Sequence, residues 1–412
     1  MNRKLQYIYN LFIAMIVSAL AVSCTDDELV KGGDKYEVVP DIPVALSLKI
    51  KVADQMEVQT RLAQSDETER TVNKLFVIAF KPSKQSDGAE NADASDDEWS
   101  VDNSAFYDTE DGLGNPIEVG KPQSVEFSMT TGLRRIYVVG NPQSGVGTLS
   151  DDELKNVKTI AALKALYSKL SDNLSVERVY FLMTGQAITK EKSEIVTVYK
   201  SGDHQGAIRE DYTMALNHVD ARITFNIIPA VGVTFEPEAY RVINIPGGTY
   251  LFSREKQNSG DNTWDYDGAG YAPSNRLSDF TEKDGKSIFE FYICENRQNP
   301  KQKISTESLL EEGTYYALRE KQEKKLITGT VEGQKYENGE YVYANAKSTY
   351  VELEGTITYK DDDGSEVYAK TTYTIHLGNT GNSNTADWLN DLELVNNYDT
   401  ERNTHYTYNV KV

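Results

Sequence analysis

The sequence predicts a mainly β protein made of two tandem β-sandwich domains, with one helix that covers a sheet of the first domain. Two observations lead to this prediction. Segments in which apolar and polar residues alternate recur along the chain, and a period of two is typical of strands that bury one face. Helical periodicity is clear in only one segment. The expected domains are residues 41–205 and 206–412, with the polar stretch 200–211 as the linker.

The clearest strand lies near the N-terminus, at residues 44–52. Every second residue of this segment is apolar, and the residues between them are small or charged. Alternation of this kind predicts a half-buried strand whose apolar side chains enter the core. These apolar residues are Val44, Leu46, Leu48, Ile50 and Val52.

Shorter signals of the same kind predict the remaining strands, and the polar stretch 86–111 is expected to be a surface loop. Residues 350–359 and 366–377 predict a hairpin that turns at Asp363-Gly364, because Asp-Gly supplies the positive φ angles of tight turns. The other predicted strands are 72–80, 125–129, 134–139, 179–183, 195–199, 221–228, 240–245 and 404–412.

The one helix is predicted over residues 150–170. Ser150 precedes three acidic residues, which is typical of an N-cap followed by a first turn that suits the helix dipole. Apolar residues then recur at spacings of three and form one stripe: Leu154, Val157, Ile160, Leu163 and Leu166.

The N-terminus has the pattern of a bacterial lipoprotein signal peptide. Two basic residues precede an apolar run, 11–22, that is too short to span a bilayer comfortably. The run ends in small residues before Cys24, the lipobox pattern in which the cysteine is acylated and the chain is cut before it. We therefore expect residues 1–24 to be signal peptide and lipidation site, residues 25–40 a tether, and the precursor anchored in the outer membrane. The acidic residues 26–28 resemble the surface-export signal of lipoproteins from the Bacteroides group.

Composition excludes several classes of function. The net charge of −21 disfavours binding to nucleic acid, whose phosphates would be repelled. Besides Cys24 the chain holds one cysteine, Cys294, which lies in an apolar run and is expected to be a buried small hydrophobic residue.

Motifs of catalysis, metal binding and cofactor binding are missing from the sequence. None of the four histidines belongs to an H-E-x-x-H pair, and neither a G-x-S-x-G elbow nor a phosphate-binding loop is present. Asp265-Tyr266-Asp267-Gly268 begins like a calcium loop but lacks the glutamate that such loops place downstream, so a turn is expected there. The prediction is a non-enzymatic protein without cofactors.

A polar segment that contains Arg61 and Arg70 follows the strand at 44–52. A trypsin-like protease that cut between Arg61 and Leu62 would separate this strand from the body, and the body from the lipid on Cys24. The body would keep a groove with five apolar pockets and open sheet edges, which another chain's strand could fill. The alternative is that Arg61 is one more solvated arginine.

The motifs of the whole chain, taken in order, resemble the fimbrillins, the subunits of the type V pili of Bacteroidales. They cover most of the expected mature length. They are VALSLK at 44–49, Arg61, KLFVIAF at 74–80, GLRRIYVVGN at 132–141, LKAL at 163–166, FLMT at 181–184, HVDARI at 218–223, FYICEN at 291–296 and ERNTHY at 401–406.

This resemblance implies two transthyretin-like sandwiches and a structural role in adhesion. Fimbrillins are exported as lipoproteins, cut after an arginine by an Arg-specific surface protease, and polymerised into a fimbrium by strand exchange. The implied partners are other fimbrial subunits, with Arg61 as the cleaved residue and Arg70 as the second choice. Polar residues of the motifs are expected to be structural: His218, Arg222, Glu295, Asn296 and Arg402.

The sequence departs from the family pattern at its C-terminus. Shaft subunits carry a further donor segment, whereas this sequence stops at Val412, directly after the ERNTHY strand. That predicts a tip or terminal position, unless the last strand is itself the donor. The alternative function is a surface lipoprotein that does not polymerise and binds a glycan or a host protein.

Overall fold

The computed structural model divides into two units, residues 1–39 and 40–412, and nearly all of the described residues belong to the second. Four residues of the processing hypothesis, Cys24, Arg61, Leu62 and Arg70, lie outside the described part of the chain, as does the turn at 265–268. The structure describes residues 38–54, 56–58, 71–142, 149–169, 181–253, 271–305, 319–320, 322–326, 336–379 and 392–412.

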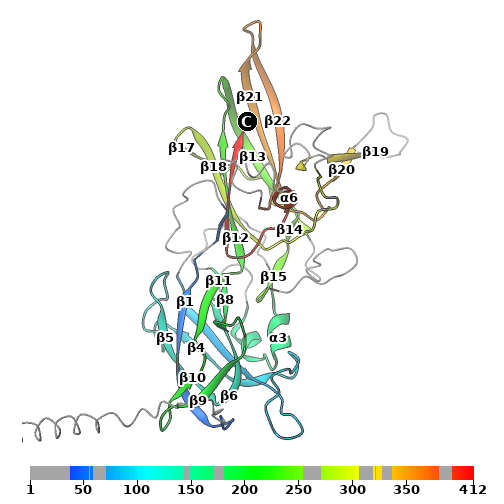
Figure 1. The fold of residues 1–412 in the computed structure, drawn as a ribbon. Coiled ribbons are helices and arrows are strands. Elements are labelled where there is room, and N and C mark those ends of the chain that lie inside the picture. The colour runs from blue at the N-terminus through cyan, green and yellow to red at the C-terminus, as the bar shows by residue number, and fades with distance from the viewer. Residues whose placement is uncertain are drawn as a thin grey trace, which may run out of the picture. The chain divides into compact units, whose positions relative to one another are not determined.

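The described residues are mainly β, as predicted, with a few short helices. A nine-stranded sheet dominates the first half and has the order β10-β9-β6-β8-β11-β1-β5, with β3 pairing both β6 and β4. Figure 1 shows β1 beside β5 and β11 in this sheet. Its strands are β1 (Pro43–Val52), β3 (Lys74–Lys81), β4 (Ser100–Asp108), β5 (Gln123–Thr130), β6 (Gly132–Gly140), β8 (Met183–Thr189), β9 (Val196–Lys200), β10 (Gly206–Ile208) and β11 (Tyr212–His218).

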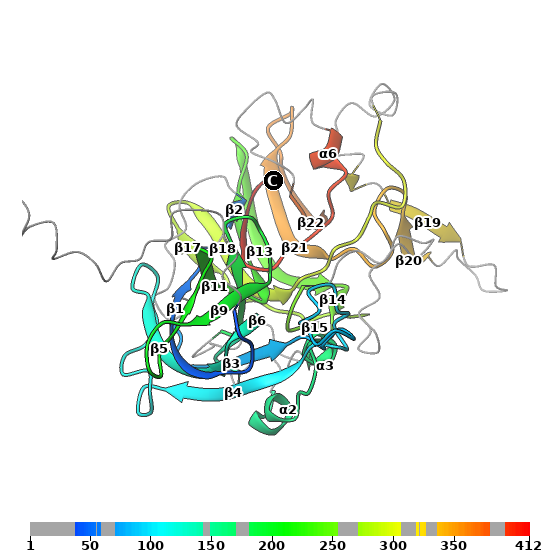
Figure 2. The same cartoon turned by 60° about the horizontal axis from the view of Figure 1, so that its bottom comes forward.

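Strand β3 is buried on both faces, which explains its unbroken apolar sequence. Leu75, Val77 and Ala79 join the core cluster that contains the apolar residues of β1. Phe76 and Phe80, on the opposite face, join a second cluster that includes residues of the helical segment. Figure 2 shows β4 running along β3, with which it pairs from Lys74↔Asp108 to Lys81↔Ser100.

The single helix predicted over 150–170 is wrong; the segment forms α2 (Asp151–Lys155), α3 (Ile160–Ala165) and the short strand β7 (Tyr167–Lys169). Ser150 is the N-cap of α2, as predicted, and it also forms a capping box with Glu153. The helix breaks because Lys158 O accepts a hydrogen bond from Val101 N of β4 at 3.1 Å, and because Thr159 caps α3. The predicted stripe is nevertheless buried at its first four positions. No helix in the described ranges is long and apolar enough to cross a membrane.

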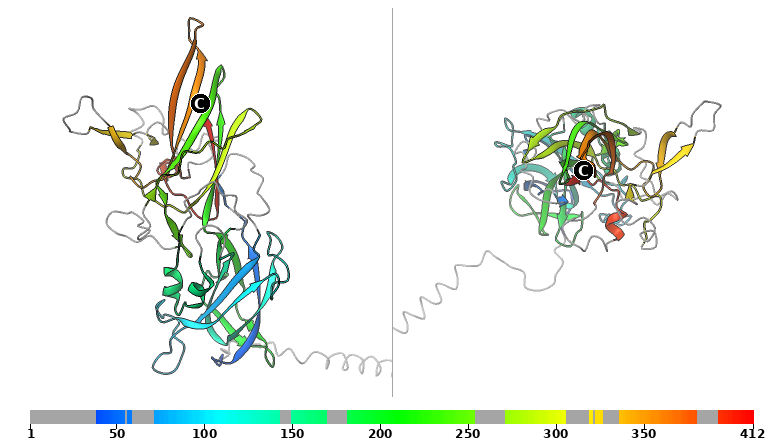
Figure 3. Two further views of the ribbon diagram at one scale, coloured as in Figure 1. Left: turned by 180° about the vertical axis from the view of Figure 1, so that it is seen from behind. Right: turned by 90° about the horizontal axis from the view of Figure 1, so that it is seen from above.

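The second half contains two further sheets around their own core. One has the order β17-β18-β12-β23-β2, and the other is β13-β21-β22. The predicted hairpin is confirmed as β21 and β22, the orange pair of Figure 3, and Gly364 in its turn has φ +83°. The strands are β2 (Met56–Val58), β12 (Asp220–Ile228), β13 (Val233–Ile243), β17 (Thr281–Lys283), β18 (Lys286–Cys294), β21 (Tyr350–Lys360), β22 (Glu366–His376) and β23 (Thr404–Lys411). Cys294 is fully buried, as predicted.

Smaller elements complete the described chain. Strand β15 pairs with β7, and so joins the segment after β13 to the helical segment of the first half. The remaining elements are β14 (Ile245–Pro246), β15 (Gly248–Tyr250), β16 (Tyr271–Ala272), β19 (Gln322–Leu326), β20 (Tyr336–Tyr341) and α6 (Leu392–Val395).

Two polar stretches take part in the first sheet instead of forming a loop and a linker. The predicted loop 86–111 contains β4, whose backbone pairs with β3 despite its polar sequence. The predicted linker 200–211 contains β10, which pairs with β9 across the expected domain boundary at 205/206. The core cluster that contains the apolar residues of β1 has Leu216 as its last buried residue, and the core of the second half begins at Ala221.

Candidate functional site

Strand β1 is the centre of the candidate site, and its predicted alternation is confirmed: each of its alternate residues from Val44 is buried, and the residues between them are exposed. The side chains of Leu48 and Ile50 have no exposed surface at all. Burying five aliphatic side chains contributes on the order of 8–15 kcal/mol as an upper bound. The five are Val44, Leu46, Leu48, Ile50 and Val52.

The backbone of β1 is paired unequally on its two edges. On one edge it runs antiparallel to β5 in continuous register, from Pro43↔Thr130 to Ile50↔Gln123. On the other edge it pairs in parallel with β11 at only Lys51 and Val52. A further bond from Ala45 N to His204 O, 2.8 Å long, supports this second edge. One neighbour therefore holds β1 along its length, and the other holds it mainly at its end.

An ionic cluster holds the residues that lead into β1. Asp41 adopts φ 65° and its N–H donates to Thr131 O at 3.0 Å. Its carboxylate lies 2.8 Å from Lys84 Nζ and 3.0 Å from Lys81 Nζ. Hydrogen bonds from Lys84 and then Lys81 lower the pKa of Asp41 to about 2. The carboxylate is therefore charged at neutral pH.

A buried arginine, Arg134, supports the end of β5 next to this cluster. Its guanidinium lies 2.9 Å from Glu90 Oε1 and 3.3 Å from Asp102 Oδ2, and it donates to Thr131 O at 2.6 Å. Such a charge is tolerated without exposure because carboxylates and a carbonyl surround it. Arg134 lies in the family motif at 132–141, but nothing in the sequence predicted this contact.

The chain after β1 continues into the second half of the fold. Ala53 N donates to Leu216 O at 2.8 Å, and Asn403 Nδ2 donates to Asp54 O at 3.0 Å. Strand β2 then lies parallel to β23, from Met56↔Thr404 to Val58↔Tyr406. The segment before Arg61 thus contributes a strand to two different sheets. The alternation Met56-Glu57-Val58 was its only signal in the sequence.

The polar motif residues from His218 onward lie among neighbouring protein groups, and all of them except His218 form hydrogen bonds or ion pairs through their side chains. Arg402 Nη1 donates to Leu251 O at 2.9 Å, and its Nη2 lies 2.5 Å from Glu295 Oε1. Asn296 Nδ2 donates to Lys347 O at 2.9 Å. Arg222 and Glu290 form an ion pair at 2.8 Å, and His218 lies buried 3.6 Å from Asp220.

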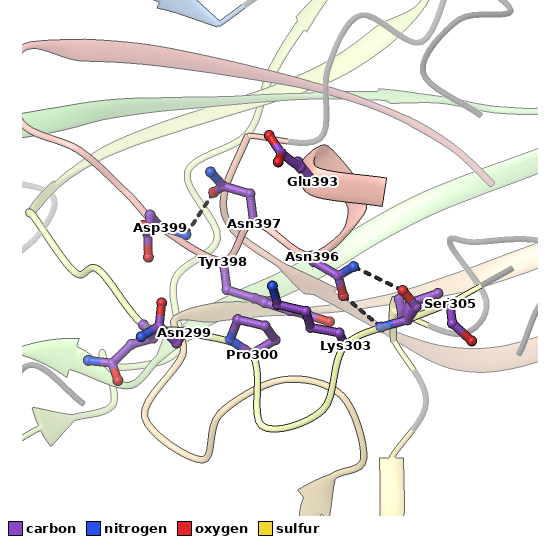
Figure 4. Close-up of a pocket in the computed structure, with 11 residues that line it drawn as sticks. Asn299, Pro300, Lys303, Ser305, Glu393, Asn396, Asn397, Tyr398 and Asp399 are labelled. Atoms are coloured by element: carbon purple, nitrogen blue, oxygen red, sulfur yellow. Dashed lines mark hydrogen bonds between the residues drawn. The ribbon is translucent and has the colours of Figure 1, made fainter. Parts of the chain in front are cut away.

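A separate pocket of about 480 Å³ lies beside α6. Figure 4 shows that the side-chain amides of two lining residues form hydrogen bonds with neighbouring backbone groups. Asn396 binds both backbone groups of Ile304, at 2.7 and 3.0 Å, and Asn397 Oδ1 accepts from Asp399 N at 2.9 Å. Groups of three or more potential metal ligands do not occur among the described residues.

Residues 44–222 match the family model of the major fimbrial subunit protein (FimA). Comparison with curated protein sequences gives no match. This family consists of structural fimbrial subunits and is not an enzyme family.

Several solved structures of fimbrial and cell adhesion proteins are similar to this chain. The tip fimbrial protein Mfa3 of Porphyromonas gingivalis, with a C-terminal truncation, is 13% identical with a TM-score of 0.44, over 90% of this chain and 95% of that chain. A putative cell adhesion protein of Parabacteroides distasonis is 14% identical with a TM-score of 0.41, over 82% and 85%. The fimbrial anchor protein Mfa2 of P. gingivalis is 10% identical with a TM-score of 0.31, over 79% and 82%.

The match to the family model begins at Val44 and ends within β12, so it contains β1 from its second residue and the other eight strands of the nine-stranded sheet. The fimbrillin resemblance that the sequence motifs predicted is thereby confirmed for this part of the chain. Over residues 44–222 the chain is similar to the family of major fimbrial subunit proteins.

Proposed function

We propose that the protein is a structural subunit of a type V fimbria that assembles by protease-triggered strand exchange and serves in adhesion. In this proposal the precursor reaches the outer membrane on a lipid attached to Cys24. A surface protease cuts between Arg61 and Leu62, β1 leaves, and a strand of another fimbrial subunit takes its place. The observation that carries the proposal is the burial of five aliphatic residues on one terminal strand that precedes Arg61 in the sequence.

The way β1 is held suits replacement by another strand. Its contacts are aliphatic burial and backbone pairing, and any extended segment with the same alternation can reproduce both. The upper bound of 8–15 kcal/mol for the five side chains is enough to hold subunits together without a covalent bond. A partner strand that fills the groove would run antiparallel to β5, as β1 does.

The position of β2 in the sequence means that a cut after Arg61 would release β1 and β2 together as one segment. Strand β2 lies on the same side of Arg61 as β1, so a cut there separates both strands from the body. Removing β2 would uncover the edge of β23 at Thr404, and removing Asp54 would free the amide of Asn403. The exchanging partner would then meet open edges on two sheets.

The position of β23 bears on the proposed tip or terminal role. It pairs in parallel with β12 from Ala221↔Thr404 to Ile228↔Lys411, and Tyr406 is buried in the core. Donating this strand to a neighbour would remove it from between β12 and β2. This argues against the last strand as the donor, and so favours a subunit that accepts a strand without giving this one.

Cleavage is tested by replacing Arg61 with Ala in the natural host and analysing the fimbriae. We expect the Arg61→Ala protein to reach the surface but to be missing from the polymer ladder on unboiled gels. Wild-type surface-shed protein should begin at Leu62 in mass spectrometry. Arg70→Ala is the matched control, which should assemble normally. If Arg61→Ala assembles and Arg70→Ala does not, the cleavage site is Arg70; if both assemble, the strand-exchange proposal is wrong.

Lipidation is tested separately with Cys24→Ala. Labelled palmitate should enter the wild-type precursor and not the variant, and the variant should fail to reach the outer membrane. A mature chain that keeps its lipid and never forms oligomers would instead support an anchor or the alternative below.

The alternative function is a non-polymerising surface lipoprotein that binds a glycan or a host protein. The pocket beside α6 favours it, because its volume of about 480 Å³ and its combination of polar side chains with a mainly apolar surface suit a small saccharide. Binding of glycans that is lost in Lys303→Ala and Glu393→Ala proteins, together with the absence of polymers, would favour this alternative.

A further inference from the structure

Strand β5 forms one wall of the groove that β1 fills. Within the described residues β1 is its only strand partner. The two strands pair at eight consecutive positions, so the departure of β1 would remove the whole backbone ladder of β5. A strand left without partners would leave the sheet, and the groove would then lose a wall before another strand could enter.

Side chains of β4 bind the other edge of β5. Tyr107 Oη donates to Glu126 O, and Asn103 Nδ2 donates to Ser128 O, each at 2.7 Å. Farther along, Thr130 donates from its N–H and from its hydroxyl to the carboxylate of Asp102, again at 2.7 Å. These contacts fall at residues 126, 128 and 130. Alternate residues of a strand present their backbone groups to the same edge, so the three contacts all lie on the edge of β5 that faces away from β1.

The side chains of Asp102, Asn103 and Tyr107 belong to β4, which is held in the sheet by strands other than β1. Strand β4 pairs along its length with β3, and β3 pairs with β6. The Asp102 side chain is 2% exposed and also binds buried Arg134. Burial raises the pKa of Tyr107 to about 12, so its hydroxyl remains a donor at neutral pH.

We propose that Asp102, Asn103 and Tyr107 form a brace that keeps β5 in place after β1 leaves, so that the cleaved subunit offers a preformed groove to a strand of alternating apolar residues. This inference rests on the proposed strand exchange. Its physical reason is preorganisation: a strand that enters a groove with both walls in position does not have to order β5 as it binds. The inner edge of β5 serves the exchangeable partner, and the outer edge serves the permanent one.

The experiment places an engineered protease site in the 59–70 stretch, so that it does not depend on the natural cleavage residue. After cutting, the tagged N-terminal segment is withdrawn in sub-denaturing urea. Hydrogen exchange of residues 123–130 and binding of a fluorescent peptide with the sequence of residues 41–58 are then measured on the stripped protein. The brace variant is Asn103→Ala/Tyr107→Phe. The control variant Asn226→Ala/Tyr368→Phe removes one side-chain amide and one phenolic hydroxyl from the second half of the fold.

We expect the amides of residues 123–130 to stay protected from hydrogen exchange in the stripped wild-type and control proteins. Both of these proteins should also bind the peptide. In the stripped brace variant these amides should exchange at least tenfold faster, and the peptide should bind at least tenfold more weakly. Before cutting, all three proteins should unfold at similar temperatures, because β1 then holds β5. If the double variant fails to fold uncut, Asn103→Ala alone is used.

Two results would overturn the brace: loss of protection at residues 123–130 in the stripped wild-type protein, or a brace variant that binds the peptide as the control does. Normal assembly of both Arg61→Ala and Arg70→Ala proteins would instead overturn the proposed function and leave the result on the brace unchanged.

Discussion

Strands β1 and β23 both complete a sheet near an end of the chain, yet different chemistry holds them. Strand β1 inserts five aliphatic side chains into the first core. Strand β23 adds polar side-chain contacts to its backbone pairing. His405 Nε2 lies 2.9 Å from Thr224 Oγ1, which in turn donates to Glu290 at 2.8 Å, and the Tyr406 hydroxyl accepts from Glu401 N at 2.9 Å.

This difference separates a replaceable strand from a permanent one. Aliphatic burial is not directional, so another strand of the same pattern can reproduce it. A hydrogen bond to a buried polar group requires one particular partner at one position, and the group is left unsatisfied when that partner goes. The comparison predicts that β1 tolerates changes of apolar shape and not loss of apolar volume, whereas β23 is sensitive to the loss of single polar atoms.

The largest expected effect is at the centre of β1. Leu48→Ala should lower the free energy of unfolding of the uncut protein by about 2–5 kcal/mol, because it removes a fully buried side chain and leaves a cavity. Ser47→Ala, on the exposed face of the same strand, should change it by less than about 0.5 kcal/mol. Urea denaturation measures both, and equal effects would mean that the two faces of β1 are not different.

A second variant tests the fit of the groove at Val44. A Cβ at Gly206 would lie 2.6 Å from Val44 Cγ2. Gly206→Ala should therefore cost about 1–3 kcal/mol through overpacking. Val44→Ala should cost less in the Gly206→Ala background than in the wild-type protein, because it removes the clashing atom. Additive costs in this double-mutant cycle would show that the two residues do not meet.

For β23 the test is Tyr406→Phe, which deletes one buried oxygen and keeps the ring. The free energy of unfolding should fall by about 1–2 kcal/mol, since Glu401 N loses its acceptor. Tyr368→Phe is the matched control because that side chain is 67% exposed, and it should be nearly neutral. A neutral Tyr406→Phe variant would weaken the contrast between β1 and β23.

The smallest expected effect concerns the ionic cluster before β1. Asp41→Asn should cost no more than about 1 kcal/mol at neutral pH, because the carboxylate is partly exposed and solvent screens the pair. The folded pKa of Asp41 is below its ordinary value, so its contribution is present above about pH 4 and is lost as the pH falls towards 2. Wild-type and Asp41→Asn stabilities, measured by urea denaturation, should therefore converge across that range; a constant difference would contradict the assigned ion pairs.

Local patterns allowed much of the fold to be predicted from the sequence. The alternation of β1, the apolar run of β3 and the Asp363-Gly364 turn each specify their own structure within a few residues. The N-cap at Ser150 was likewise a local signal that the structure bears out.

The features that could not be predicted from the sequence depend on contacts between distant residues. The helix breaks at Lys158 because β4 competes for its backbone, and β4 itself is a strand because β3 offers an edge. The brace uses Asn103 and Tyr107, two polar residues in a stretch whose composition is that of a loop. Such contacts become visible only when the sheet order is known.

The bond between Asn403 and Asp54 joins residues 349 positions apart. Contacts of this span slow folding, since the closure of a long loop must precede any gain from them. The segment of β1 and β2 is made before the strands that receive it, yet β2 can dock only after residues 404–406 have been synthesised and folded. Strand β2 is therefore among the first segments to be made and among the last to reach its native place, whereas the strand partners of β1 are complete at residue 218.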